Sequence, residues 1–120
     1  MRRMSFSATT EQMHNRTKTV TRRGVNTWAG LSPGDEIMAI EKGMGLAEGE
    51  KQVPIGVIEI VSNQVEPLGN VNEAEARLEG FGSLSEFVAV WDGLNGGWHE
   101  DGLVRRIQFR HSAKDEGVKE

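Results

Sequence analysis

Hydrophobic and polar positions divide the chain into short elements that are separated by glycine-rich turns. Residues 36–41 and 53–61 are rich in aliphatic and β-branched side chains, and residues 103–110 alternate between apolar and polar, so all three segments are predicted strands. Residues 5–7 form a fourth, shorter candidate strand. Residues 31–35, Leu-Ser-Pro-Gly-Asp, predict a turn, because proline fixes φ and glycine accepts positive φ.

Three sites carry a helix-start signal, in which a polar capping residue is followed three positions later by Glu or Gln. The pairs are Thr9 with Gln12, Asn72 with Glu75, and Ser83 with Glu86. The first pair predicts a short helix over 10–16, and the second predicts a helix that ends at Gly80. The third starts a helix that should stop before the Asn-Gly-Gly sequence at 95–97.

The helix after Ser83 carries an apolar stripe at helical spacing, which indicates core packing and not a cofactor site. The stripe consists of Leu84, Phe87, Val88 and Trp91. Strands and short helices together predict an α+β fold, with a small curved antiparallel sheet or open barrel and helices at its ends. With 120 residues, the chain has room for one domain, which we assign to 1–111. The polar and charged tail, 112–120, is predicted to be disordered.

Several classes of protein are not expected from the composition. The chain has no cysteine, which excludes a disulfide framework and any thiolate metal site. His99-Glu-Asp101 matches no metal-ligand spacing, so no metal is expected. The Gly-x-Gly in the loop 43–51, predicted as a mobile hairpin loop, is not followed by the helix and parallel strand of a dinucleotide site, and no cofactor is expected. No apolar run reaches the roughly 18–20 residues of a membrane span, and we expect a cytoplasmic protein.

The most distinctive segment is the basic, hydroxyl-rich run from Arg16 to Arg23. Through Arg23 the chain has six Lys/Arg and one acidic residue, whereas the remainder has eight basic and seventeen acidic residues. A concentrated positive site on an acidic protein can attract an anionic ligand. The alternative is an exposed edge strand, in which Lys and Arg discourage pairing with other chains. Trp28 follows the run and would either stack on a nucleobase or close one end of the barrel.

Lys18 and Thr21 could together perform acyl transfer. A threonine hydroxyl needs a base, and lysine can be that base only when burial and neighbouring cations lower its pKa. Thr21 and Lys18 point to opposite faces of a regular strand, however, so the segment has to bend, whereas Thr19 shares a face with Thr21. The oxyanion of such a reaction would be stabilised by backbone N–H groups or by an arginine, and the sequence leaves this choice open.

Three short motifs occur in an order that resembles the ASCH domain family of the PUA-like superfamily. They are the Lys-Thr-Val-Thr-Arg-Arg run at 18–23, Pro33-Gly34-Asp35 and Glu79-Gly80-Phe81. The resemblance covers about residues 4–111 and implies a pseudo-barrel with a cleft lined by the basic segment. It also implies RNA or a modified nucleoside as the ligand. The long loop 43–51 departs from the shorter members that are enzymes.

One subgroup of that family hydrolyses the acetyl amide of N4-acetylcytidine with a lysine, a threonine and a glutamate. The resemblance assigns these roles to Lys18, Thr21 and Glu79, while an ordinary helix-end carboxylate stays the alternative for Glu79. The residues expected to bind the ligand are Arg16, Thr19, Arg22, Arg23 and Trp28. Binding of RNA or a nucleoside is therefore the first functional hypothesis, an amidohydrolase is the second and a ribonuclease is the third. The sequence does not give the oligomeric state.

Overall fold

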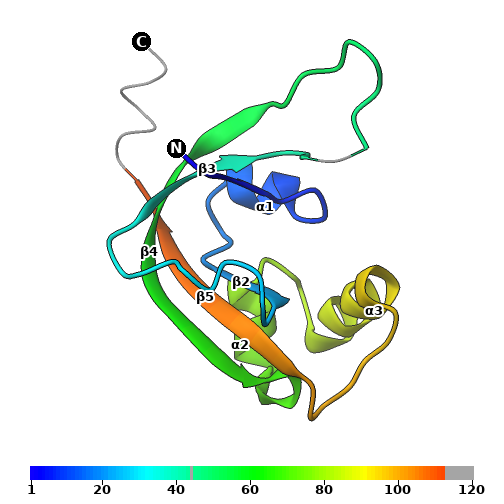
Figure 1. Ribbon diagram of the computed structural model, residues 1–120. Coiled ribbons are helices and arrows are strands. Elements are labelled where there is room, and N and C mark those ends of the chain that lie inside the picture. Colours follow the sequence, from blue (N-terminus) through cyan, green and yellow to red (C-terminus); the bar gives the residue numbers. More distant parts are fainter. Residues whose placement is uncertain (44, 113–120) are drawn as a thin grey trace.

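A curved mixed sheet with short helices on one side forms the molecule (Figure 1). The computed structural model describes residues 1–43 and 45–112, and in these residues the five strands have the order β1-β3-β4-β5-β2. The strands are β1 (Arg3–Ser5), β2 (Val20–Gly24), β3 (Glu36–Ile40), β4 (Pro54–Pro67) and β5 (Leu103–His111). The helices are α1 (Thr10–His14), α2 (Glu73–Leu78), α3 (Leu84–Asn95) and the 3₁₀ turn η1 (Leu68–Asn70). The predicted α+β class with a curved sheet is confirmed.

The sheet differs from the prediction in the direction of one strand pair and in the length of one strand. β1 pairs in parallel with β3, whereas the remaining pairs are antiparallel as expected. β4 continues to Pro67, beyond the predicted end at residue 61, because its polar second half pairs with β5. The register with β5 shifts between Ile60 and Ser62, and such a bulge bends a strand. β4 and β5 are therefore two long, curved strands that lie side by side (Figure 1).

A helix follows each of the three helix-start signals, but a side-chain capping bond forms in only two of them. The side chains of Asn72 and Ser83 accept hydrogen bonds from the backbone N–H groups three residues later, at 2.8 and 3.2 Å. Thr9 precedes α1 but makes no side-chain capping bond, and α1 ends at His14, two residues before the predicted end. Thr9 is instead buried. No helix in the described part of the chain is long and apolar enough to cross a membrane.

The loop between β3 and β4 occupies residues 41–53, and because the two strands are antiparallel it closes a hairpin as predicted. The tail predicted to be disordered lies outside the described residues except for Ser112. The backbone N–H of Ser112 donates to the carbonyl of Val57 at 2.9 Å, so the hydrogen bonding between β4 and β5 extends to this residue.

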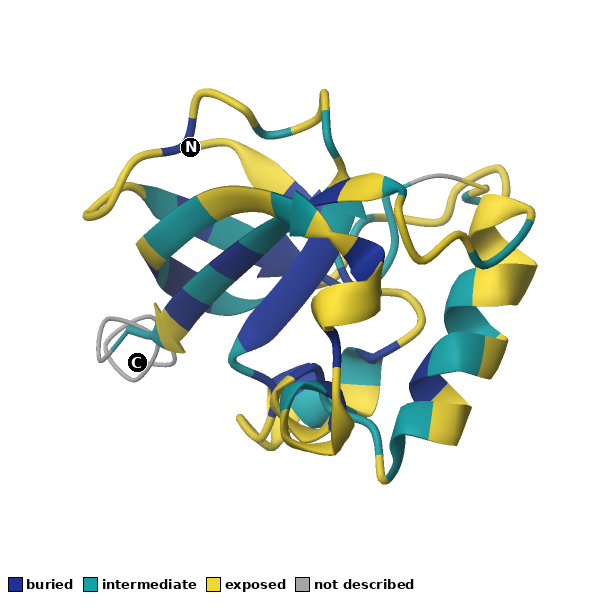
Figure 2. Ribbon diagram, turned by 90° about the horizontal axis from the view of Figure 1, so that it is seen from below, coloured by how far each residue is buried: buried dark blue, intermediate teal, exposed yellow. Residues whose placement is uncertain are grey.

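The buried apolar residues form two clusters. Figure 2 shows where buried residues lie along the ribbon. The larger cluster fills the concave side of the sheet against α1, and its buried members are Met4, Phe6, Met13, Leu31, Ile37, Ala39, Ile58, Ile60, Ile107 and Phe109. The smaller joins η1, α2 and α3 to the start of β5, and its buried members are Leu68, Val71, Ala76, Phe87 and Val104. The stripe predicted on α3 does pack against this second cluster, through Leu84, Phe87 and Trp91.

The end of α2 fixes the contact between α2 and the segment that leads into β2. Gly80 has φ +97°, and its N–H donates to the carbonyl of Arg77 at 2.9 Å. The N–H of Phe81 donates to the carbonyl of Ala76 at 3.0 Å, which completes a Schellman motif. A Cβ on Gly80 would lie 2.9 Å from Cβ of Gln12 and 3.3 Å from Cβ of Lys18. Glycine is therefore required here by backbone conformation and by space.

We expect Gly80→Ala to lower the free energy of unfolding by about 2–4 kcal/mol, because a left-handed conformation and a steric clash add their costs. Gly93→Ala is the matched control, since Gly93 lies inside α3 and a Cβ there meets nothing within 4 Å. This control should raise the free energy of unfolding by about 0.5–1 kcal/mol. Urea denaturation followed by tryptophan fluorescence measures both, and similar values for the two variants would contradict the prediction.

Candidate functional site

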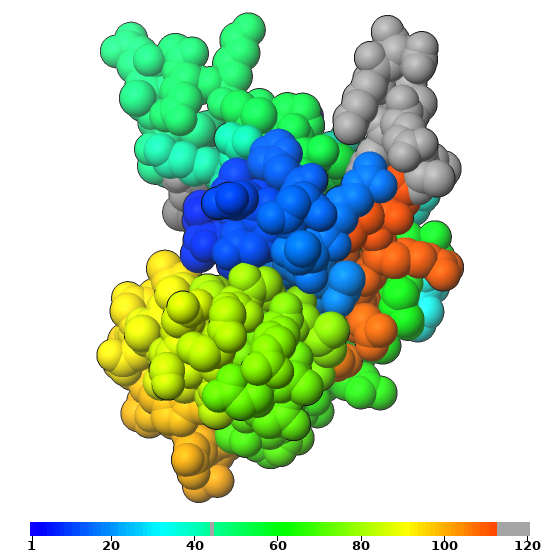
Figure 3. All heavy atoms as spheres, turned by 180° about the vertical axis from the view of Figure 1, so that it is seen from behind, coloured from blue at the N-terminus to red at the C-terminus, as the bar shows by residue number. Residues whose placement is uncertain are grey.

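A cavity of about 230 Å³ lies between the start of β2, the turn after β1 and helix α3. From behind, the N-terminal part of the chain rests directly on α2 and α3 (Figure 3). One part of the cavity wall is polar and is lined by Ser5, Ser7, Thr9, Lys18, Thr21, Arg22, Arg23 and Glu79. Another part is apolar and is lined by Phe6, Phe81, Phe87, Val90, Trp91 and Leu94.

Lys18 and Thr21 reach the same cavity because the chain is not a regular strand between them. β2 begins at Val20, so Lys18 precedes it. The backbone of Thr19 is held from two sides: its N–H donates to the carbonyl of Leu78 at 2.8 Å, and its carbonyl accepts from Phe109 at 2.9 Å. The alternation of side chains therefore applies only from Val20 onward, and both groups line one cavity.

The amine of Lys18 is almost completely buried against the end of α2. Its side chain is 3% exposed, and Nζ donates to the backbone carbonyl of Glu79 at 2.7 Å and to Oε1 of Glu79 at 3.0 Å. Burial lowers the pKa of Lys18, although the Glu79 carboxylate acts in the opposite direction. The amine can therefore lose its proton more readily than an exposed lysine.

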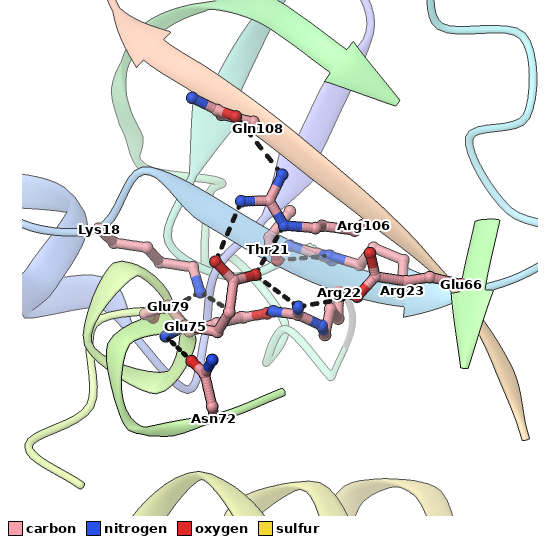
Figure 4. A network of polar contacts seen from close by, with 10 residues as sticks. All are labelled: Lys18, Thr21, Arg22, Arg23, Glu66, Asn72, Glu75, Glu79, Arg106 and Gln108. Carbon is pink, nitrogen blue, oxygen red and sulfur yellow. Dashed lines mark hydrogen bonds and ion pairs between the residues drawn. The ribbon is translucent and has the colours of Figure 1, made fainter. Parts of the chain in front are cut away.

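Arg22 lies beside this pair but points into a network of carboxylates (Figure 4). Its guanidinium donates to Oε2 of Glu79 at 2.9 Å, to Glu75 at 2.6 Å and to Glu66 at 3.0 Å, and its side chain is 0% exposed. Burial opposes the charge of Arg22, but the bonds to Glu75 and Glu79 outweigh burial and raise its pKa. Nε of Arg22 is buried without a hydrogen-bond partner among the described residues. The positive charge of Arg22 is thus balanced by carboxylates inside the protein.

Glu75 joins this network to the last strand. Arg106 on β5 donates to both carboxylate oxygens of Glu75, at 2.7 and 3.2 Å, and Glu75 lies between Arg106 and Arg22 (Figure 4). The hydrogen bonds from Arg106 are the main cause of a lowered pKa of Glu75. The network therefore connects α2, β2, β4 and β5 through side chains alone.

Arg23 is the immediate neighbour of the Thr21 hydroxyl. Its Nε donates to Oγ1 of Thr21 at 3.1 Å, and Nη2 donates to the carbonyl of Ser5 at 2.8 Å. The guanidinium carbon lies 4.9 Å from the centre of the Phe6 ring, within the range of a cation–π contact. Burial lowers the pKa of Arg23 to about 10, so the group is charged at neutral pH.

The structure places five of the predicted site residues at the cavity and three elsewhere. Those at the cavity are Lys18, Thr21, Arg22, Arg23 and Glu79. Arg16, Thr19 and Trp28 are not among the residues that line it. Trp28 packs against the larger apolar cluster and is covered by the guanidinium of Arg2, whose carbon is 4.5 Å from the ring centre, while Arg16 is exposed.

The apolar part of the cavity wall was not expected from the sequence. Phe87 and Trp91 belong to the stripe interpreted as core packing, and they do pack against the smaller cluster, yet both also line the cavity. Phe81, next to the Schellman glycine, lies below Nζ of Lys18, with the ring centre 5.9 Å away. A helical stripe has the same appearance in a sequence whether it faces a core or a cavity, so periodicity could not separate the two.

Comparison with known proteins supports the fold. No protein-family model matches the sequence, and no curated protein shows significant similarity to it. The structure is similar to protein EF3133 from Enterococcus faecalis V583, which carries the family designation DUF984. The TM-score is 0.58 at 15% identity, over 88% of this chain and 70% of that one. It is also similar to an ASCH domain from Lactobacillus crispatus JV V101, with a TM-score of 0.55 at 18% identity, over 92% of this chain and 79% of that one. The chain therefore has an ASCH-type fold.

Proposed function

We propose that this chain is an amidohydrolase that acts on a small acylated amine of the N4-acetylcytidine type. The observation that carries the proposal is the placement of a buried lysine amine, a threonine hydroxyl and a glutamate at one small cavity. Its volume of about 230 Å³ is below the range of roughly 300–1,000 Å³ typical of pockets that enclose a drug-sized ligand. We therefore place the base and its amide inside the cavity and the sugar at its opening.

Glu79 prepares Lys18 to act as the base. A neutral amine has two N–H groups, and the carbonyl and carboxylate of Glu79 are positioned to accept both. The lone pair of Lys18 is then left for the proton of a hydroxyl. The carboxylate of Glu79 is bound on its other oxygen by Arg22, so its orientation is fixed. Glu79 is in this scheme a positioning residue.

The reaction proceeds in two halves. Lys18 removes the proton of Thr21 as Oγ1 bonds to the amide carbon, and the carbonyl electron pair moves onto oxygen. When this pair returns, the C–N bond breaks, and the leaving amine takes the proton from Lys18. Water, deprotonated by Lys18, then attacks the acyl ester of Thr21. As the ester C–O bond breaks, Oγ1 of Thr21 takes the proton back from Lys18, and acetic acid leaves and ionises to acetate in solution.

The electrostatic surroundings of Lys18 support a lysine that loses its proton readily. Burial is the largest influence and lowers the pKa of Lys18, and the positive charges of Arg23 and Arg22 act in the same direction. The Glu79 carboxylate opposes this shift but does not cancel it.

Binding of extended RNA has less support from the same contacts. Phosphate recognition needs cations that can reach a strand of phosphates on the surface. Arg22 is enclosed by carboxylates, and Lys18 is held by Glu79. Much of the basic run thus points inward, toward a cavity of limited volume, which favours a single small ligand.

Thr21→Val should abolish conversion of N4-acetylcytidine to cytidine, with a loss of roughly a thousandfold or more in kcat, because the nucleophile is removed while volume is preserved. Chromatography of the reaction products measures the conversion. Calorimetry measures whether the variant still binds N4-acetylcytidine, which shows that the cavity is intact.

Thr19→Val is the matched control for that experiment, since Thr19 lies two residues away and does not line the cavity. It should retain nearly full activity. Loss of activity in Thr19→Val but not in Thr21→Val would assign the nucleophile to Thr19. No conversion by the wild type, together with RNA binding that weakens steeply with salt, would instead favour the RNA-binding hypothesis.

The lowered pKa of Lys18 predicts a pH dependence for both activity and stability. The wild-type kcat/KM should rise with pH until Lys18 is neutral and then level off. Between that folded-state pKa and the unfolded value of 10.5, the unfolded chain binds more protons at Lys18 than the folded chain does. The free energy of unfolding of the wild type, relative to Lys18→Met, should therefore increase with pH across this window.

Denaturant titrations of both proteins between about pH 6 and 10 measure this difference, and effects of other groups largely cancel. A difference that stays constant over the range would mean that Lys18 has an ordinary pKa in the folded protein. A difference that falls with pH would mean that Glu79 outweighs burial.

A further inference from the structure

Arg23 differs from the other cations at the cavity in the kind of partner that it has. Its acceptors are the neutral hydroxyl oxygen of Thr21 and the neutral carbonyl of Ser5. Within residues 1–43 and 45–112, no carboxylate lies at ion-pair distance from Arg23, whereas Lys18 and Arg22 both have carboxylate partners. Its guanidinium also has more N–H donors than these two contacts use. A partly buried positive charge with no carboxylate at ion-pair distance is a favourable place for an anion.

The position of Arg23 is fixed before any ligand arrives. The Phe6 ring supports its planar face, and the bonds to Thr21 and Ser5 fix its edge. Thr21 and Arg23 are two positions apart on β2, so strand alternation directs both side chains to the same face. The guanidinium is thus preorganised next to the oxygen that would attack the substrate.

We propose that Arg23 is the oxyanion-binding residue of the reaction and that it binds the carboxylate product at the same place. This inference rests on the proposed amidohydrolase function. In the tetrahedral intermediate one carbon carries two oxygens on this side, Oγ1 of Thr21 and the former carbonyl oxygen. A guanidinium fork matches two oxygens on one carbon, and Arg23 already donates to one of them. Acetate presents the same pair of oxygens after hydrolysis.

Arg23 and Arg22 are neighbours in the chain but have different partners. The terminal nitrogens of Arg22 are occupied by Glu66, Glu75 and Glu79, and its Nε is not accessible. Arg22 therefore supports the site as a structural ion, while Arg23 contacts the reacting oxygen. Such a donor acts mainly in the transition state, so its loss should lower kcat much more than it changes KM.

The first test is independent of turnover and uses acetate as the probe, with acetamide as its neutral counterpart. We expect acetate to shift the ¹⁵N–¹H signal of Arg23 Nε in the wild-type protein, and acetamide to leave it unchanged. Arg23→Met, which can still pack on Phe6, should bind acetate at least about tenfold more weakly. Arg23→Lys keeps a positive charge and should retain part of the affinity.

Arg105→Met is the matched control. Arg105 pairs with Arg23 across the two strands, and it also donates to neutral acceptors, the carbonyl of Val25 and Oδ1 of Asn63. It does not line the cavity, so this variant should bind acetate like the wild type. If Arg23→Met does not fold, the test rests on the acetate affinity of Arg23→Lys and on the acetate-induced shift of the Arg23 Nε signal in the wild type. Equal acetate affinity in wild type and Arg23 variants, or a shift at Arg105 in place of Arg23, overturns the inference.

The second test measures hydrolysis of N4-acetylcytidine. Arg23→Met should lower kcat by about 100–1,000-fold with little change in KM, and acetate should inhibit the wild type competitively but not this variant. Active protein with an unchanged kcat in Arg23→Met would overturn the oxyanion role and leave the proposed function in place. Acetate binding at Arg23 without any hydrolysis would overturn the proposed function and leave a carboxylate-binding site.

Discussion

The architecture of this molecule depends on one interaction, in which Lys18 and Arg22 both bind the carboxylate of Glu79. It closes the contact between the end of α2 and the segment that enters β2, which are far apart in the sequence. The Schellman turn at Gly80 brings Glu79 to this place, because its backbone leaves no room for a side chain beside Gln12 and Lys18. Lys18, Arg22 and Glu79 all line the cavity, so this contact also forms part of its wall.

Stability alone does not account for such a buried network of ions. Removing charges from water costs several kcal/mol per ion, and replacing a buried ion pair with apolar residues is often neutral or stabilising. Arg22 even leaves one buried nitrogen without a partner in the described structure. A lysine that burial pushes toward its neutral form is an additional cost to folding, but it is what a base needs. The arrangement is therefore better explained by chemistry at the cavity than by stabilisation of the fold.

Local signals in the sequence predicted local structure well. The caps at Asn72 and Ser83, the Pro-Gly-Asp turn and the hairpin between β3 and β4 each depend on a few neighbouring residues, and the structure contains all of them. The second half of β4 could not be predicted, because its polar residues form a strand only when β5 supplies the hydrogen-bond partners. The parallel pairing of β1 with β3 and the cavity wall from α3 likewise depend on contacts between distant segments.

Strand alternation explains why one basic run has two different roles. In the sequence, Arg22 and Arg23 form a single patch of charge. From Val20 onward, however, alternate side chains lie on opposite faces of β2, so Arg22 faces the carboxylates of α2 and β4 while Arg23 faces Ser5 and Phe6. Lys18 lies before the strand and escapes this alternation, which allows it to join Thr21. In the sequence these charges resemble a surface that binds phosphates. In the structure Arg22 belongs to an internal ion network, whereas Arg23 lies beside a hydroxyl. This division favours acyl chemistry on a small ligand over the binding of a long anionic chain.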